Sequence, residues 1–140
     1  MRTAVDTSVL LDVLGGDARF GEASREALRR AYDTGGLVAC EVEWAEVRAH
    51  FGSEAAFTSA MDALGVAFLP MSLAAAALAG SLWRDHHQER SRVGGGAPAQ
   101  KRVVADFLIG AHALLHADSL LARDRGFFRR SFRGLKLQQP

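Results

Sequence analysis

Four acidic residues are placed along the chain so that their side chains could share one metal site: Asp6, Glu46, Asp106 and Asp124. The first follows the short run Thr3 to Val5, and the last follows Leu120 to Ala122 after a single arginine. Short apolar runs of this kind indicate strands. The carboxyl ends of parallel strands face a common ligand crevice, so we expect Asp6 and Asp124 at the same edge of a sheet.

Clustered carboxylates need a counter-charge, and this requirement predicts a divalent metal. Two carboxylates about 4 Å apart repel each other by roughly 4 kcal/mol at an effective dielectric constant near 20. Mg²⁺ or Mn²⁺ would relieve that repulsion, because both ions prefer carboxylate and water ligands. One or two such ions can also bind phosphate oxygens and activate a water. Hydrolysis of a phosphodiester is therefore the chemistry that these acids predict.

The helix expected from about residue 103 to residue 117 carries Asp106 on a face of small residues. Gly110, Ala113 and Ala117 all lie within about 40° of Asp106 at 100° per residue. We expect this face to approach the sheet closely and to carry the carboxylate inward. The alternative is a first-turn acid that interacts with the helix dipole.

A helix expected from about residue 41 to residue 51 offers three acids, of which Glu46 is the best candidate. Its apolar arc consists of Val42, Ala45 and Ala49. Glu46 lies about 40° from Val42, whereas Glu41 and Glu43 lie about 100° away on opposite sides. Only Glu46 is then expected to be half-buried. Glu43 remains the alternative second acid, because the start of the helix is uncertain by a few residues.

Short strands alternate with helices along the chain, which predicts an α/β fold with a mainly parallel sheet of four to five strands. With 140 residues, 49% hydrophobic and 24% charged, residues 1–140 form one expected domain. The segment 91–100, which contains three consecutive glycines and Pro98, is expected to be a flexible loop and lacks the pattern of a P-loop. The lone cysteine, Cys40, rules out an intrachain disulfide. No leader or long apolar run is evident, so we expect a cytoplasmic protein that does not enter a membrane.

Basic residues are concentrated near the end of the chain. Residues 119–140 hold six basic residues and one acid, a net charge of +5, which leaves −4 for residues 1–118 in a chain of net charge +1. Four arginines in this segment could guide a phosphate-chain substrate toward the acids: Arg123, Arg125, Arg129 and Arg130. The alternative is a solvated face.

Other polar residues are weaker candidates for the site. His112 and His116 share a helix face but lie about 80° to 120° from Asp106, so a shared metal is not expected. Asp12 is expected in a turn or on a helix surface, although it is close in sequence to Asp6.

Four segments together resemble the PIN domain family in order and approximate spacing: Val5 to Leu10, Ala45 to Val47, Ala105 to Ala111 and Ala122 to Phe127. Length and single-domain organisation are similar to those of VapC-type toxins. The resemblance implies a three-layer α/β/α sandwich, a divalent-metal-dependent endoribonuclease site, a cognate antitoxin and a homodimer. It also implies that Ser8 supports the acidic cluster. Two positions depart from the family pattern, because Ala122 and Cys40 stand where hydroxyl residues are commoner.

Three other functions compete with the ribonuclease. A haloacid-dehalogenase-like phosphatase would need a second acid where Ser8 stands, and a receiver-like module would need an acid next to the first strand. A catalytically inactive PIN-like module that binds RNA or protein fits the same four segments. The RNA target, the cleavage site and the chemistry of the ends stay open at this stage.

Overall fold

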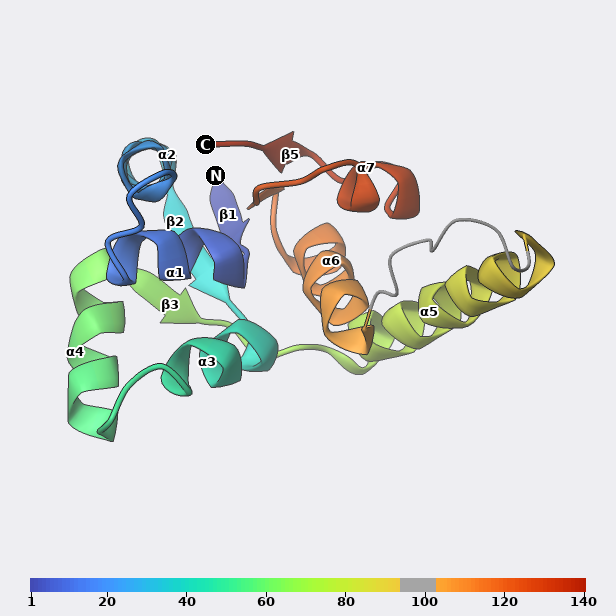
Figure 1. Ribbon diagram of the computed structural model, residues 1–140, viewed down its shortest axis with the longest axis horizontal. Helices are drawn as coiled ribbons and strands as arrows, with labels where there is room; N and C mark the ends of the chain where they lie inside the picture. The colour runs from blue at the N-terminus through green and yellow to red at the C-terminus, as the bar shows by residue number, and fades with distance from the viewer. Residues whose placement is uncertain (94–102) are drawn as a thin grey trace.

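The computed structural model describes residues 1–93 and 103–140, and describes side chains for residues 1–89 and 103–140. Within these ranges strands and helices alternate (Figure 1). In chain order the elements are β1 (Arg2–Val5), α1 (Thr7–Leu14), α2 (Gly21–Thr34), β2 (Gly36–Ala39), α3 (Glu41–Arg48), α4 (Glu54–Leu64), β3 (Val66–Phe68), α5 (Leu73–Val93), α6 (Val104–His116), β4 (Ser119–Leu121), α7 (Phe127–Ser131) and β5 (Leu137–Gln138).

The five strands form one sheet in the order β3-β2-β1-β4-β5, and every neighbouring pair is parallel. In the central strand, Ala4 lies opposite Val38 of β2 and Leu120 of β4. After β1 the chain adds β2 and β3 on one side, and it then adds β4 and β5 on the other. The order thus changes direction between β1 and β4. In open α/β sheets, ligands bind outside the carboxyl ends of the strands at such a switch point.

Neighbouring residues of the central strands belong to two separate hydrophobic cores. Ala4 and Leu120 lie in one core, whereas the next residues, Val5 and Leu121, lie in the other. The first core draws its helical residues mainly from α5, α6 and α7, and the second from α1 to α4. Because successive strand residues point to opposite faces, helices cover both sides of the sheet. This arrangement confirms the predicted three-layer α/β/α sandwich.

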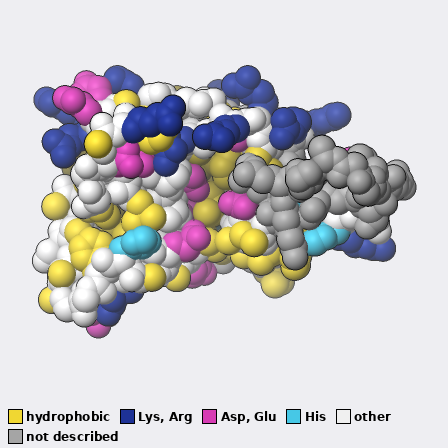
Figure 2. All heavy atoms as spheres, in the orientation of Figure 1, with side chains coloured by type: hydrophobic (Ala, Val, Ile, Leu, Met, Phe, Trp, Pro, Cys, Tyr) yellow, Lys and Arg dark blue, Asp and Glu magenta, His cyan; other side chains and the backbone are white. Residues whose placement is uncertain are grey.

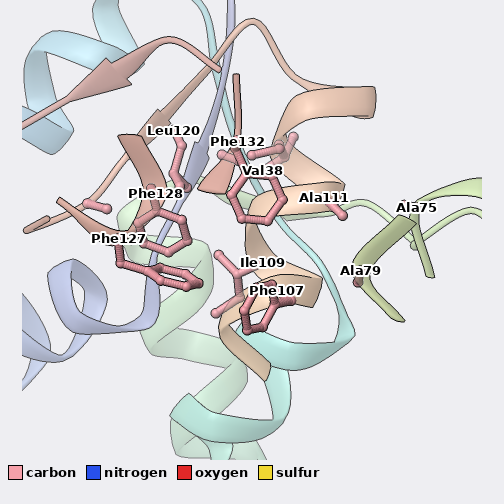
Figure 3. Packing of buried hydrophobic residues seen from close by; sticks show 13 residues of the cluster. Val38, Ala75, Ala79, Phe107, Ile109, Ala111, Leu120, Phe127, Phe128 and Phe132 are labelled. Atoms are coloured by element: carbon pink, nitrogen blue, oxygen red, sulfur yellow. The ribbon is translucent and has the colours of Figure 1, made fainter. Parts of the chain in front are cut away.

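Aromatic residues from α6 and the C-terminal segment dominate the first core (Figure 3). The rings of Phe107 and Phe127 meet edge to face, with centroids 5.1 Å apart. Phe128 and Phe132 extend the same cluster. Burying such a side chain contributes about 2 to 3 kcal/mol. The packing therefore fixes α7 and the C-terminal segment against α6.

Local signals set several helix ends. Ser72, just before α5, accepts a hydrogen bond from the Ala75 amide at 3.1 Å. Gly65 ends α4 with a φ of 73°, a left-handed conformation that glycine adopts without steric cost.

The helix α5 continues to Val93, so the first three residues of the predicted 91–100 loop are helical. The rest of that predicted loop lies outside the described residues. Of the helices that are described, none is both long and apolar enough to cross a membrane.

At Gly110 the small face of α6 meets an aromatic ring. A Cβ atom built on Gly110 would lie 2.3 Å from Cε2 of Phe132, a side chain that is only 2% exposed. The missing side chain makes room for this ring, which belongs to the segment that follows α7.

We expect Gly110→Ala to destabilise the protein by about 1 to 3 kcal/mol, because the added methyl group overpacks the Phe132 ring. The matched control is Gly80→Ala in α5, where an added Cβ has no neighbour within 4 Å. There, alanine should stabilise the helix by about 1 kcal/mol. Urea denaturation of both variants measures the difference. Equal stabilisation by the two substitutions would contradict the packing at Gly110.

Candidate active site

Asp6 lies at the carboxyl end of the central strand, where the direction of the strand order changes. Its amide donates to the Leu121 carbonyl at 2.9 Å, which joins the ends of β1 and β4. Asp6 is the N-cap residue of α1, yet its side chain makes no capping hydrogen bond. The carboxylate instead accepts a hydrogen bond from the Ser8 hydroxyl at 2.6 Å. Ser8, which the family resemblance places in support of the acids, therefore contacts Asp6 directly.

Asp106 brings a second negative charge to Asp6. It lies in the first turn of α6 and is half-buried. Burial is the main cause that raises the pKa of Asp6; the Ser8 hydrogen bond opposes this, and the charge of Asp106 raises the pKa further. The two acids, 100 residues apart in sequence, are thus electrostatic neighbours in the fold.

Glu46 is linked to the same strand end through Thr7. The buried Thr7 hydroxyl donates to Oε1 of Glu46 at 2.8 Å, and Thr7 directly follows Asp6. This hydrogen bond connects α3 to the start of α1. Glu46, Asp6 and Asp106 are therefore all associated with the carboxyl end of β1.

The helical-wheel prediction for α3 was wrong about burial. Glu43 is completely buried, whereas Glu46 and both alanines of the predicted apolar arc, Ala45 and Ala49, are exposed. The helix packs through Glu43 and Val47, which are one turn apart. Glu46 reaches the site region from an exposed position rather than from a half-buried one.

A capping interaction explains why a carboxyl group lies inside the protein at the start of α3. Oε2 of Glu43 accepts a hydrogen bond from the Cys40 amide at 2.8 Å, in the reciprocal arrangement of a capping box. The other oxygen, Oε1, is buried and has no hydrogen-bond partner among the described residues. Burial raises the pKa of Glu43 to about 7, and the charge of Asp6 contributes to the same shift.

Asp124 is engaged with the next helix. Its Oδ1 accepts a hydrogen bond from the Phe128 amide at 3.1 Å, and its Oδ2 accepts one from the Arg129 amide at 3.2 Å. Both bonds satisfy amide groups in the first turn of α7, where a negative charge also interacts favourably with the helix dipole. The expected fourth metal ligand thus has a capping role in this structure.

The predicted acids do not form a preassembled metal cage. In the part of the chain that is described, no three Asp, Glu, His or Cys side chains are close enough to hold one ion. The donor chemistry nevertheless fits a hard divalent cation, because the groups at the strand end are carboxylates. Like charges on Asp6 and Asp106 would also be stabilised by a cation. Asp6, Asp106 and Glu46 are the carboxylates associated with this strand end. Asp124, the fourth predicted acid, follows β4 and is bonded to the amides of α7.

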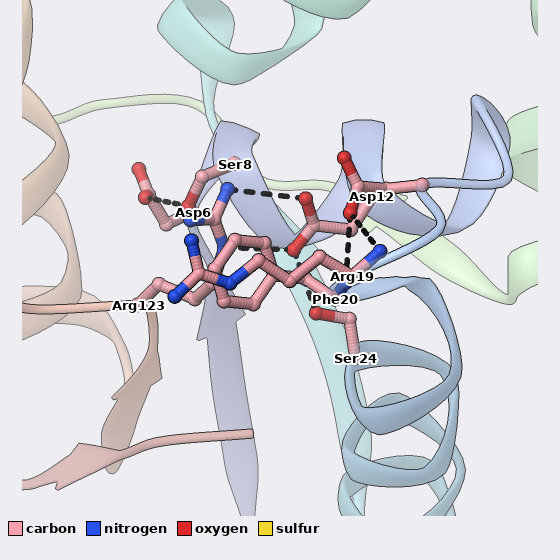
Figure 4. A network of polar contacts seen from close by, with 8 residues as sticks. Asp6, Ser8, Asp12, Arg19, Phe20, Ser24 and Arg123 are labelled. Atoms are coloured by element: carbon pink, nitrogen blue, oxygen red, sulfur yellow. Dashed lines mark hydrogen bonds and ion pairs between the residues drawn. The ribbon is translucent and has the colours of Figure 1, made fainter.

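The predicted RNA-binding arginines fall into two groups. Arg125, Arg129 and Arg130 are exposed. Arg123 is instead paired with Asp12, with the Nε to Oδ2 distance 2.8 Å (Figure 4). Basic side chains border the upper edge of the face in Figure 2, over α2 and α7; a few acidic side chains lie among them at the upper left, and others lie nearer the middle. The exposed arginines therefore remain candidates for contact with a polyanion.

Asp12 is the residue whose environment the sequence analysis missed. It was expected in a turn or on a helix surface, but it is only 4% exposed. Besides Arg123, it accepts a hydrogen bond from the Ser24 hydroxyl at 2.8 Å. Its position in the second turn of α1, on the same side as the buried Val9, was the available signal. Its basic partner lies 111 residues away in sequence.

The histidines serve the packing of α6. The ring of the buried His112 is hydrogen-bonded through Nε2 to the Leu69 carbonyl at 2.9 Å. His116 contacts the Ser72 hydroxyl at 2.7 Å. These contacts tie α6 to the segment between β3 and α5.

A groove of about 350 Å³ lies between α1, α2 and α4. It is lined by Val13, Arg25, Leu28, Arg29, Tyr32, Asp62, Ala63, Leu64 and Gly65. None of the predicted site acids lines it, so the groove is separate from the strand-end acids.

The sequence model of the PIN domain family matches residues 3–133. The chain therefore belongs to the PIN domain family, whose members are generally nucleases that use divalent metals. No curated protein sequence matches the chain.

Solved structures of VapBC and VapC proteins share its fold. A chain of VapBC2 from Rickettsia felis, bound to a DNA fragment from its promoter, matches with a TM-score of 0.69 and 16% identity, over 99% of this chain and 98% of that one. DNA-bound VapBC from Salmonella typhimurium matches with a TM-score of 0.64 and 12% identity, over 99% of this chain and 98% of that one. Mycobacterium tuberculosis VapC20, a toxin that cleaves the sarcin-ricin loop, matches with a TM-score of 0.59 and 16% identity, over 93% of this chain and 95% of that one.

The buried Glu43 should make stability depend on pH. Its pKa is raised from 4.5 to about 7, so the folded state holds the proton more tightly than the unfolded state. Stability should therefore fall as pH rises from about 4.5 to about 7, by roughly 3 kcal/mol in total, and should level off above that range.

Glu43→Gln should flatten this profile, because an amide can accept the Cys40 hydrogen bond without titrating. Urea denaturation from pH 4.5 to pH 8 in a metal chelator measures the effect. A shallower slope of the same sign should remain, because the pKa of Asp6 is also raised. Parallel profiles for the wild type and the variant would show that Glu43 does not cause the dependence.

Proposed function

We propose that this protein is an endoribonuclease that requires Mg²⁺ or Mn²⁺ and acts as the toxin of a type II toxin–antitoxin pair. The observation that carries the proposal is the pairing of Asp6 with Asp106 at the carboxyl end of the central strand of a PIN domain. The structural similarity to VapC20, described as a toxin that cleaves the sarcin-ricin loop, supports RNA as the substrate class.

The proposed metal ligands are Asp6, Asp106, Glu46 and Asp124, for one or two ions. A bound divalent cation would lower the pKa of an attacking water and neutralise charge on the phosphate. The chain itself supplies orientation. Ser8 holds the Asp6 carboxylate and Thr7 holds that of Glu46. For Asp124 to join the site, its carboxylate would have to bind metal as well as the amides of α7, or exchange one for the other.

The exposed Arg125, Arg129 and Arg130 are proposed to attract the RNA backbone. The VapBC structures with the same fold contain an antitoxin with the toxin, which supports a cognate antitoxin as partner here. A homodimer and a cytoplasmic location are further parts of the proposal, and both rest on family membership. Co-purification with the product of a neighbouring small gene would test the antitoxin.

A second candidate is a PIN-like module that binds RNA or protein without cutting. The capping role of Asp124 and the lack of a preassembled three-ligand group among the described side chains favour it. The two proposals differ in whether RNA is cleaved when Mn²⁺ is supplied.

Purified protein, free of antitoxin, should cleave RNA in Mn²⁺, and Asp6→Asn should reduce the rate by about 100-fold or more, because a group that stabilises developing charge is lost. Ser8→Ala should reduce it by about 10-fold to 100-fold through misorientation of Asp6. The control is Asp33→Asn, an exposed acid near the end of α2. Cleavage products are mapped on tRNA, rRNA and mRNA. If the wild type and all three variants leave the RNA intact, the result would favour the binding module.

Metal binding can be measured without cleavage. At a concentration one hundred times the dissociation constant, Mn²⁺ should stabilise the wild type by about 2.7 kcal/mol. Mn²⁺ should stabilise Asp106→Asn less, because one carboxylate of the pair is lost. It should stabilise Asp33→Asn as much as the wild type. Thermal unfolding with and without Mn²⁺ gives the comparison. The same gain for all three proteins would place the metal elsewhere.

A further inference from the structure

Arg123 makes its strongest contacts inside the protein, although its charge and place in sequence suggested RNA binding. The Nε and Nη2 atoms of its guanidinium donate to the two carboxylate oxygens of Asp12, at 2.8 and 3.1 Å (Figure 4). This is the bidentate geometry in which arginine binds carboxylates most specifically. The Asp12 side chain is only 5% exposed, so the ion pair is shielded from water on the acid side.

The flat face of the Arg123 guanidinium is also occupied. Its Cζ lies 4.1 Å from the centroid of the Phe20 ring, within the range of a cation–π contact. Arg19 approaches the same ring at 4.9 Å. Both the hydrogen-bonding edge and a face of the Arg123 guanidinium are thus used within the fold.

These contacts connect the elements that carry the proposed metal ligands. Arg123 lies between β4 and α7, next to Asp124. Asp12 belongs to α1, the helix that begins directly after Asp6, and Ser24 ties Asp12 to α2. The strands β1 and β4 pair in parallel, and the Asp6 amide extends that pairing through its hydrogen bond to the Leu121 carbonyl. The Asp12–Arg123 ion pair adds a side-chain connection two residues beyond Leu121.

We propose that Arg123 is a positioning residue rather than an RNA ligand. Through Asp12 and Phe20, it fixes the segment from Ala122 to Gly126, and with it Asp124 and α7, relative to the helix that follows Asp6. The exposed arginines of the same segment, Arg125, Arg129 and Arg130, would then contact the RNA. The consequence for catalysis rests on the proposed nuclease function, whereas the connection itself does not.

Thermal unfolding tests the connection without any activity. Arg123→Gln should lower the Tm by about 10 °C, because it leaves the buried Asp12 without its charged partner. Adding Asp12→Asn should recover part of that loss, since no buried charge is then unpaired. Arg123→Lys keeps the charge but loses the bidentate geometry and stacking, so its Tm should lie between those of the wild type and Arg123→Gln. An unchanged Tm for Arg123→Gln, or no recovery in the double variant, would overturn the proposal.

RNA binding in a chelator, where no cleavage is expected, distinguishes positioning from direct contact. Loss of one phosphate contact lowers the slope of log affinity against log salt by about 0.7 for single-stranded RNA. Arg129→Gln, in the exposed part of α7, should show this change with the Tm unaltered. Arg123→Lys, which remains folded and cationic, and Arg123→Gln should both keep the wild-type slope. A slope for Arg123→Gln reduced as much as that of Arg129→Gln would identify an RNA ligand instead.

Cleavage kinetics then report the consequence for the site. If RNA is cut, Arg123→Lys should lower kcat with little change in KM, because Asp124 is misplaced while the charge remains. A rise in KM at unchanged kcat would contradict positioning. If no variant cuts or binds RNA, the proposed function fails, and the Tm comparison still decides whether Arg123 makes the connection.

Discussion

Asp6 and Asp106 place two acidic groups close together in a half-buried position, and the surrounding structure makes this tolerable. Burial and mutual repulsion both favour the neutral form of Asp6, as its raised pKa shows. The Ser8 hydrogen bond opposes that tendency and keeps the carboxylate oriented. A divalent cation would satisfy the same requirement more completely, because it neutralises both charges. The two neighbouring acids thus make this position electrostatically favourable for a cation.

The strand order explains why this region lies where it does. With β1 in the centre and β4 beside it, the residue after β1 lies where the connections turn to opposite sides of the sheet. From there, α1 leads into one layer and α6 belongs to the other, so Asp6 and Asp106 approach from different layers. The aromatic core around Phe107, Phe127 and Phe132 holds α6, which carries Asp106, against α7.

Glu43 and Glu46 of α3 show where sequence reasoning fails and why. A helical wheel counts apolar side chains, and it treated Ala45 and Ala49 as the buried face. In the fold, Glu43 is buried because its carboxylate caps the helix start, and a hydrogen bond of that kind offsets the cost of burial in a way that hydrophobicity does not record. Asp12 was misjudged for a different reason, because its partner Arg123 is remote in sequence.

The sequence alone determined the α/β class, most elements and the family, because strand and helix periods and short motifs are local properties. It also selected Asp6 and Asp106 from many acids. Tertiary structure decided the rest: which glutamate of α3 is buried, that Gly110 accommodates Phe132, that Asp124 caps α7, and that Arg123 pairs with Asp12. The contacts of Gly110 and Arg123 depend on which remote groups meet when the layers pack, whereas Glu43 and Asp124 bond to nearby backbone amides whose availability depends on where each helix begins. In each case of a polar group, the free energy of burial is set by its hydrogen-bond or ionic partner, which a hydrophobicity pattern does not record.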